Sequence, residues 1–213
     1  MALLSGFFQS NNGDRVYRSD FFASYFASFV GNGVFANPSS NLQVIAGTGL
    51  NIAVSQGKGW INGYYLVNDG PYALTLTQAD GALSRIDRVV MALNFDTREI
   101  GVYVKRGAPS GNPTAPALQR DTNLYELALA DIRLNAGTTS ITQSNITDTR
   151  LNAQLCGVVT GVINQVDTTT LYNEYQTYLN EFRQSGTQQF QNFLTVSQQE
   201  FDEFFEALQD TLS

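Results

Sequence analysis

Three charged residues, Arg85, Asp87 and Arg88, stand directly before the apolar run VVMAL in the stretch LSRIDRVVMALNFDTREIGVYVKRG. A carboxylate between two guanidinium groups fits either an acid–base or binding cluster, or a set of charge-assisted bonds that holds a strand end in place. Structural charge-assisted bonds require no substrate or further residue, because a guanidinium and a carboxylate match each other in geometry. We therefore predict a structural ion network of Arg85, Asp87 and Arg88 at a sheet edge or a subunit seam.

Paired carboxylates are the other arrangement that could do acid–base work. Two combinations are available, Asp87 with Asp131 and Asp148 with Glu126. Arginines lie near these acids in the chain, namely Arg85, Arg88, Arg133 and Arg150. The expected role of the carboxylates is therefore a charge-assisted bond that ties strand ends together.

Other catalytic signals are missing from the sequence. It contains no histidine, which is the commonest general base and metal ligand, so the lone Cys156 has no partner to activate it and is predicted to be a buried structural thiol. Lys58 and Lys105 lie in predicted turn and strand-end positions, and GTGLNIAVSQGKG lacks the Gly-Lys-Ser/Thr order of a phosphate-binding loop. No acidic spacing matches a calcium loop. We predict no enzyme activity, no cofactor and no metal.

Composition and charge narrow the class of protein further. The 213 residues are 43% hydrophobic and 15% charged, as in globular proteins. Residues 1–170 carry 11 Lys and Arg against 12 Asp and Glu, whereas residues 171–213 carry 1 against 7. The sequence has no basic patch, so we predict that the protein does not bind nucleic acid. It also has no apolar run of ~18–20 residues, so we predict no insertion into a membrane. A single cysteine excludes an internal disulfide and favours synthesis in the cytoplasm.

A short aromatic helix is predicted near the N-terminus, in RSDFFASYFASFVGNG. Its large side chains recur at helical spacing: Phe22, Tyr25, Phe26 and Phe29. Ser19 or Asp20 is expected to cap its start, and the sequence Gly31-Asn32-Gly33 to end it. Such a helix must bury its aromatic face, either on the sheet of its own domain or on a neighbouring subunit.

Short half-alternating runs from Leu42 to about Ile163 predict an antiparallel β-sandwich. LNIAVSQGKGWINGYYLV is expected to form two strands around Gly57-Lys58-Gly59, and the strand pair in VVMALNFDTREIGVYVKR to turn at Asp96–Glu99. The segments ALTL, LYELALADIRL and TSITQSNITDT supply further strands. The segment GAPSGNPTAPAL, with its three prolines, is predicted to be an extended surface connection.

The C-terminal region predicts a long amphipathic helix with one apolar seam. The seam comprises Leu171, Tyr175, Tyr178, Phe182, Phe190, Phe193, Phe201, Phe204 and Leu208. Its spacing departs from a strict heptad between Phe182 and Phe190, so a break near Gly186 that gives a helical hairpin is the alternative to a continuous helix. In either form the seam needs partners outside its own chain, which predicts an oligomeric bundle or coiled coil.

The expected fold is therefore mainly β with α, in three parts. Residues 1–40 form an N-terminal arm and the aromatic helix, residues 41–165 form the β-sandwich, and residues 166–213 form the helical oligomerisation segment.

Five segments in the same order resemble the baseplate structural proteins of long-tailed, siphovirus-type phages and prophages of Gram-positive bacteria. They are NNGDRVYRSDFFASYFASFVGNGVF, VSQGKGWINGYYLV, RIDRVVMALNFDTREIGVYVKRG, NLYELALADIRLNAGTTSITQSNITDTR and LCGVVTGVINQVDTTTLYNEYQTYLNEF. The resemblance implies a β-sandwich "shoulder" domain, like that of lactococcal phage receptor-binding proteins, through which such proteins attach to the tail tip.

The resemblance also implies a virion component and not an enzyme, made in the host cytoplasm and located at the virion tail tip. Its partners would be other phage tail or baseplate proteins and further copies of itself, in a homotrimer because phage fibres are usually threefold. Family members often continue into a longer receptor-reading region, whereas this chain stops at Ser213. We therefore expect either that this protein is a short adaptor, or that another protein carries the module that recognises the receptor.

A receptor-binding protein that contacts a host cell-wall saccharide is the alternative function. Its site would be built from exposed aromatic residues such as Trp60, Tyr64 and Tyr65, because aromatic rings stack on sugar rings. Trp60 follows Gly59 in a predicted turn, although an aromatic residue at a strand start is also typical of a core position.

Overall fold

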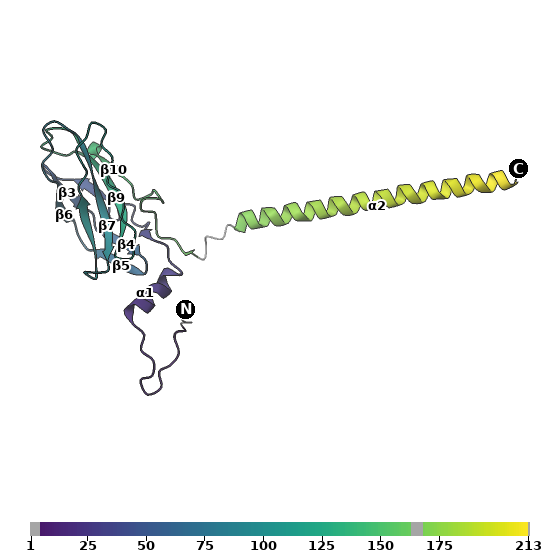
Figure 1. The fold of residues 1–213 in the computed structure, drawn as a ribbon, viewed down its shortest axis with the longest axis horizontal. Helices are drawn as coiled ribbons and strands as arrows, with labels where there is room; N and C mark the ends of the chain where they lie inside the picture. The colour runs from purple at the N-terminus through teal and green to yellow at the C-terminus, as the bar shows by residue number, and fades with distance from the viewer. Residues whose placement is uncertain (1–4, 163–167, 213) are drawn as a thin grey trace. The chain divides into compact units, whose positions relative to one another are not determined.

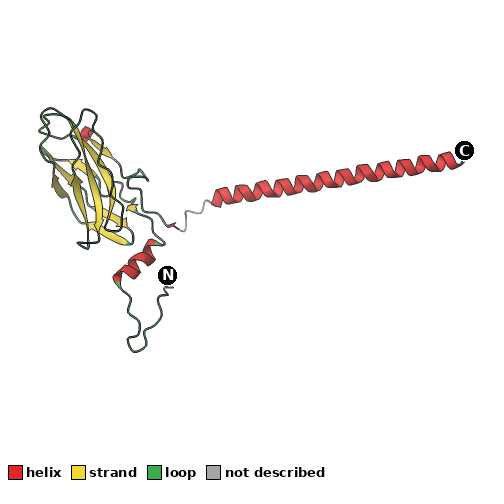
Figure 2. Cartoon of the chain, viewed as in Figure 1, coloured by secondary structure: helices red, strands yellow, loops and turns green. Residues whose placement is uncertain are grey.

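The structure is a computed structural model that describes residues 5–162 and 168–212, with side chains in the last helix described for residues 174–209. The chain divides into two compact units, residues 1–163 and residues 164–213. The described residues of the first unit are mainly antiparallel β with short helical segments, and those of the second unit form a long helix (Figures 1 and 2).

Three antiparallel sheets make up most of the first unit. The first sheet has the order β1 (Gly33–Val34), β4 (Gly57–Ile61), β5 (Tyr64–Asn68). The second has the order β10 (Ile146–Asp148), β9 (Leu124–Leu134), β7 (Arg85–Asn94), β8 (Glu99–Lys105), and the third the order β2 (Val44–Ala46), β3 (Asn51–Val54), β6 (Tyr72–Thr75). The helix α1 (Ser19–Ala27) precedes them, and a short 3-10 helix (Gln143–Asn145) leads into β10.

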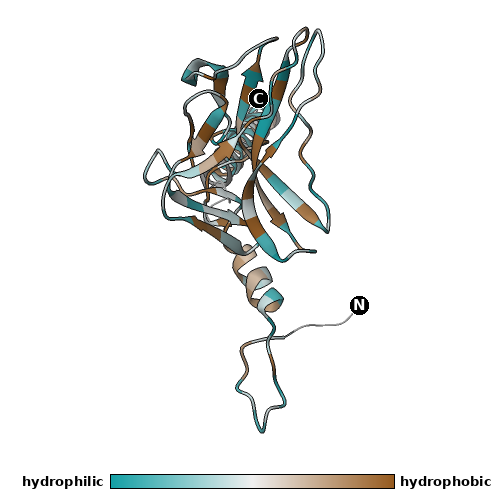
Figure 3. Cartoon of the chain, turned by 90° about the vertical axis from the view of Figure 1, so that its left-hand side faces the viewer, coloured by the Kyte–Doolittle hydropathy of each residue, from teal (hydrophilic) through white to brown (hydrophobic). Residues whose placement is uncertain are grey.

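One hydrophobic core joins all three sheets. Ile52 of the third sheet, Ile61 of the first and Met91 of the second are each at most 1% exposed and belong to the same packed cluster. Apolar and polar residues alternate along several strands, as Figure 3 shows by colour, because successive side chains of a strand point to opposite faces. The core therefore takes alternate residues from each strand.

The strand β7 is buried on both faces. Val89, Met91 and Leu93 belong to the shared core, whereas Val90 and Ala92 are buried outside it. The proline-rich segment 108–119 is hydrogen-bonded over this second face, to the side chains of Arg88 and Glu126. The segment 149–156 is bonded to the backbone of β9 at Ala128 and Leu129. The proline-rich segment thus contains no strand, as the sequence predicts, and it serves as a cover.

The predicted turn at Gly57-Lys58-Gly59 is wrong, because these residues lie within strand β4. A side chain at Gly57 would collide with Asn41 and with the backbone nitrogen of Leu42, and one at Gly59 would collide with the side chain of Met91. These glycines therefore permit a close approach within a strand and do not form a turn. The hairpin between β4 and β5 turns instead at Asn62-Gly63, where both residues have positive φ, the conformation that Asn-Gly favours in two-residue hairpins.

Two other local predictions need correction. The N-cap of α1 is Arg18, so neither Ser19 nor Asp20 occupies the cap position. The segment TSITQSNITDT is mostly irregular, and only Ile146–Asp148 of it pairs as a strand, with β9. The hairpin of β7 and β8, by contrast, turns between Asn94 and Glu99, close to the predicted residues.

The second unit is the helix α2 (Thr168–Leu212), which runs without a break through Gly186. The predicted alternative of a helical hairpin is therefore not found. A glycine inside a helix costs about 1 kcal/mol relative to alanine, which is a small penalty beside the cooperative extension of the turns on either side.

A chain that ends at Ile163 should stay folded and mainly β, because the core cluster comes entirely from the first unit. Its far-ultraviolet circular dichroism should lose most of the helical signal of the full chain and keep the β signal, with a cooperative thermal transition. A disordered product would mean that the first unit depends on α2 for its stability.

Candidate interaction surfaces

Two of the three charged residues singled out in the sequence, Arg85 and Asp87, form a buried ion pair. Arg85 and Asp87 are both fully buried, and Arg85 Nε donates to Asp87 Oδ1 at 2.9 Å. The remaining donors of Arg85 reach the carbonyl oxygen of Gln78 at 2.7 Å and the hydroxyl of Thr77 at 2.9 Å, and Asp87 also accepts from the amide of Gly107 at 2.9 Å. Every contact is internal, which leaves this carboxylate no open side for a substrate.

Arg88 belongs to a different cluster, on the opposite face of β7. It forms a two-bond ion pair with Asp131 at 2.7 and 2.8 Å and donates to the carbonyl oxygen of Pro116 at 2.7 Å. The predicted network of three residues is thus two separate pairs, because Asp87 and Arg88 are adjacent in a strand and point to opposite faces. Both pairs lie near the start of β7, where its pairing with β8 ends at Arg88.

Two further ion pairs fasten irregular segments to the sheets. Lys105 Nζ lies 2.7 Å from Glu126, which also accepts from the amide of Gln119. Arg150 pairs with Asp148 at 2.6 Å and donates to the carbonyl oxygen of Asn41. These bonds match the predicted role of tying strand ends together.

Neither of the two available carboxylate combinations forms an acid–base pair. Asp87 and Asp131 lie on opposite faces of the sheet, and Asp148 and Glu126 each face their own cation. The hydrogen bond from Arg150 lowers the pKa of Asp148, so this contact stabilises the fold at neutral pH and weakens as the carboxylate is protonated in acid. Arg133 has a different partner, the side chain of Asn135.

Cys156 is buried, as the sequence predicts, with 4% of its surface exposed. Burial raises the pKa of its thiol to about 12. The thiolate, which is the reactive form, is therefore scarce at neutral pH.

The folded protein should consequently resist thiol reagents. At pH 8 we expect Cys156 to react at least a hundredfold more slowly in the native chain than in urea, because burial removes both access and thiolate. Mass spectrometry of the alkylated protein over time measures both rates. Rapid labelling of the native chain would contradict this burial.

The three aromatic residues proposed for saccharide binding do not share one surface. Trp60 and Tyr65 are cross-strand partners whose rings stack at 6.5 Å, and Tyr65 is exposed. Tyr64 faces the core side and packs against Phe95 at 5.7 Å. Trp60 lies in strand β4 and not in a turn, and its buried Nε1 has no hydrogen-bond partner among the residues that the structure describes.

A second aromatic surface, not among the residues predicted from the sequence, lies where β5, β6 and β8 meet. Exposed Val67, Tyr72 and Tyr103 line a groove of about 250 Å³ there. Val67 and Tyr103 alternate with less exposed neighbours on their strands, and this alternation is the signal that could have identified them. Tyr72 gives no such signal, because the next residue of its strand, Ala73, is exposed as well. Flat rings beside an open groove suit stacking on a sugar ring.

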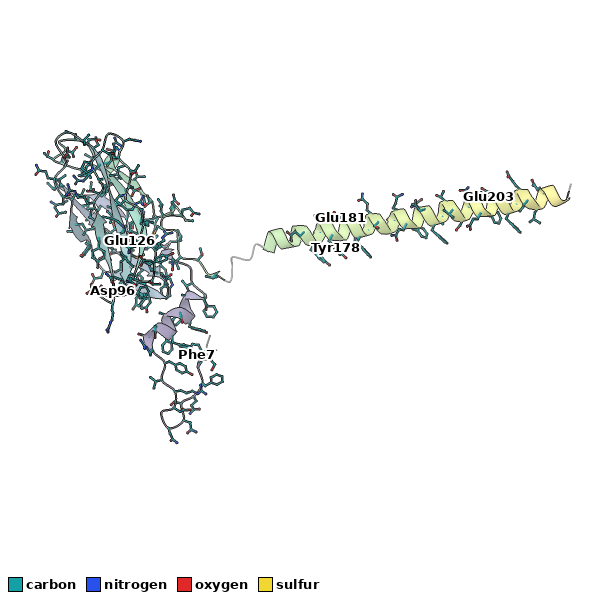
Figure 4. All side chains as sticks on the ribbon, viewed as in Figure 1. Phe7, Asp96, Glu126, Tyr178, Glu181 and Glu203 are labelled. Carbon is teal, nitrogen blue, oxygen red and sulfur yellow. The ribbon has the colours of Figure 1, made fainter. Side chains whose placement is uncertain are left out.

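The aromatic face of α1 is largely exposed, which contradicts the expectation that it packs on its own sheet. Ala23 is the buried residue of this helix, and it contacts the hairpin at Gly63 so closely that a side chain there would collide with its carbonyl group. The remaining rings form a cluster with the N-terminal arm, in which Phe7 (labelled in Figure 4) meets Tyr25 at 4.5 Å. The cluster comprises Phe7, Tyr17, Phe21, Phe22, Tyr25, Phe26 and Phe29. The other expectation from the sequence, that the aromatic face of α1 docks on a neighbouring subunit, stays a prediction.

The predicted seam of α2 is exposed along its described length. Its members from Tyr175 to Leu208 are between 41% and 68% exposed, and Figure 4 labels Tyr178 among them. Leu171 lies in the helix, but its side chain is outside the described residues. An apolar stripe of this length on a water-exposed helix is typical of an association surface.

Sites of other kinds are not found in the described part of the chain. Residues 5–162 and 168–212 contain no group of three acidic, cysteine or histidine side chains placed to hold a metal ion. Among the same residues, no helix is long and apolar enough to cross a membrane. Comparison with family models, with curated proteins and with solved structures finds no match to this chain.

Proposed function

We propose that this chain is a non-enzymatic structural component of a phage tail-tip baseplate, which associates with copies of itself through α2 and attaches to other tail proteins through its first unit. The observation that carries the proposal is the exposed aromatic seam on a continuous helix of 45 residues. Such a surface needs a protein partner to be stable in water.

The first unit supports an assembly role over a catalytic one. Arg85, Arg88 and Arg150 each bond both a carboxylate and the backbone of a separate segment, so the charges brace the fold. The ordered sequence segments that resemble siphophage baseplate proteins agree with a shoulder-like β-sandwich for this unit. In this proposal the exposed cluster around α1 is the surface that docks on a neighbouring tail protein or subunit.

Purified phage particles from a host that carries this gene provide the test. The proposal expects the chain in the particles, detected by mass spectrometry and located at the tail tip by gold-labelled antibody. Deleting the gene should give tails without a complete tip and without adsorption to the host. A protein that is absent from purified particles would overturn the proposal.

Saccharide binding at the host cell wall is the second candidate, and the groove of Val67, Tyr72 and Tyr103 favours it. The purified protein should then bind cell-wall material in a pull-down, and Tyr103→Ala should reduce this binding at least tenfold while Tyr178→Ala leaves it unchanged. Equal binding by both variants, or none by the parent, would count against a saccharide site in the groove.

A further inference from the structure

The sequence of α2 repeats every 11 residues. Successive segments read LYNEYQTYLNE, FRQSGTQQFQN, FLTVSQQEFDE and FFEALQDTLS, and they begin at residues 171, 182, 193 and 204. The first position is always apolar: Leu171, Phe182, Phe193 and Phe204. The ninth position is also always apolar: Leu179, Phe190, Phe201 and Leu212. Between them, the fifth position reads Tyr175, Gly186, Ser197 and Leu208.

This repeat explains the departure from heptad spacing. Positions 1, 5 and 9 are separated by steps of 4, 4 and 3 residues, which gives ~3.67 residues per turn against ~3.6 for a straight helix. The seam therefore stays on one side of an uninterrupted helix with little rotation. The 8-residue step from Phe182 to Phe190 is the step from position 1 to position 9 of the repeat, and Gly186 occupies position 5 between them. The 11-residue repeat places Leu179 in the seam, at position 9, and places Tyr178 next to the seam, at position 8.

We infer that α2 binds the α2 helices of identical chains along this 11-residue seam, in parallel and in register, as a nearly straight bundle with a slight right-handed supercoil. The parallel order rests on the proposed function, in which all first units attach to one tail and therefore lie at the same end of the bundle.

A second copy fits the seam because small positions then meet small positions. In register, Gly186 lies beside Gly186 and Ser197 beside Ser197, while the phenylalanine rings above and below fill the space between the helices. A partner without the same repeat would leave both small positions under-packed. The area is also sufficient: the exposed side chains could bury ~1,000 Å² per copy, and stable interfaces bury about 800 Å² per partner.

The acidic residues oppose this arrangement. Five of the seven acids in residues 171–213 lie within the last 14 residues: Glu200, Asp202, Glu203, Glu206 and Asp210. Parallel copies bring these charges side by side, whereas antiparallel copies would separate them and place Ser197 opposite Gly186. Since exposed charges are screened within ~8–10 Å at physiological salt, we expect the buried seam to prevail and the association to strengthen as salt is added.

Disulfide cross-linking tests the orientation. Ser197→Cys should form disulfide-linked dimers on mild oxidation, whereas Gln199→Cys, two residues on and therefore on the opposite side of the helix, should form few. The native Cys156 does not interfere, because it is buried. Links that form only when Ser197→Cys is mixed with Gly186→Cys would overturn the parallel order, and equal linking of Ser197→Cys and Gln199→Cys would overturn the seam.

Two deletions test whether the seam is continuous. Removing residues 182–192 takes out one full repeat of about three turns, so both halves of the seam stay aligned and the oligomer should persist. Removing residues 183–191 takes out about two and a half turns and places the halves on opposite faces, so association should weaken at least tenfold even though this variant keeps Phe182.

Sedimentation analysis of the full-length variants measures both results. Equal association of the two deletions would overturn the 11-residue frame, as would a monomeric parent. A monomeric parent would also contradict the self-association in the proposed function, whereas the placement of the chain in a phage tail is tested separately, by its presence in purified particles.

Discussion

Replacing Phe193 and Phe204 with aspartate in one chain is expected to convert the oligomer to a monomer while the first unit stays folded. Both residues occupy the first position of the repeat and are about 60% exposed on the single helix, so association must bury them. A carboxylate in that place loses the apolar contact and carries a buried-charge penalty of several kcal/mol, which corresponds to more than a hundredfold weaker association. Light scattering measures the mass.

A matched control separates burial from added charge. Thr195→Asp together with Gln191→Asp adds the same charge on the other side of the helix, and this variant should remain oligomeric. Circular dichroism should show an intact β signal in both variants. An unchanged oligomer in the phenylalanine variant would mean that the seam is not the association surface.

Asp87→Ala is expected to destabilise the first unit by about 3–5 kcal/mol, because removing one partner of a buried ion pair leaves the other charge unpaired. For a chain of this size, each kcal/mol lowers the melting temperature by about 2–4 °C, so a decrease of roughly 10 °C is expected in thermal unfolding. Arg88→Ala should have a smaller effect, since its partner Asp131 is partly exposed and can be hydrated.

The exposed pair of Arg18 and Asp20 provides the control for this prediction. Their side chains are 83% and 61% exposed, so Asp20→Ala should change the stability by less than about 1 kcal/mol. If Asp87→Ala melted at the parent's temperature and instead abolished a hydrolytic activity, the structural assignment of this carboxylate would be wrong.

Several features of this protein follow from local sequence patterns alone. The spacing of Phe182, Phe193 and Phe204 determines a helix with one apolar side, because helical periodicity is a property of neighbouring turns and needs no distant contact. The hairpin between β7 and β8 was equally predictable, since two alternating runs flank a short polar turn. The burial of Cys156 was expected because the sequence contains no histidine that could activate its thiol.

Only the tertiary structure decided which side of a strand each residue faces and what it meets there. Gly57 and Gly59 read as turn residues, yet they lie in a strand because Asn41 and Met91, distant in the chain, occupy the space a side chain would need. Arg85 and Arg88 read as one network, yet adjacent strand residues point apart and find different partners. Such choices depend on long-range packing, in which residues far apart in sequence compete for the same volume, and local patterns do not contain that information.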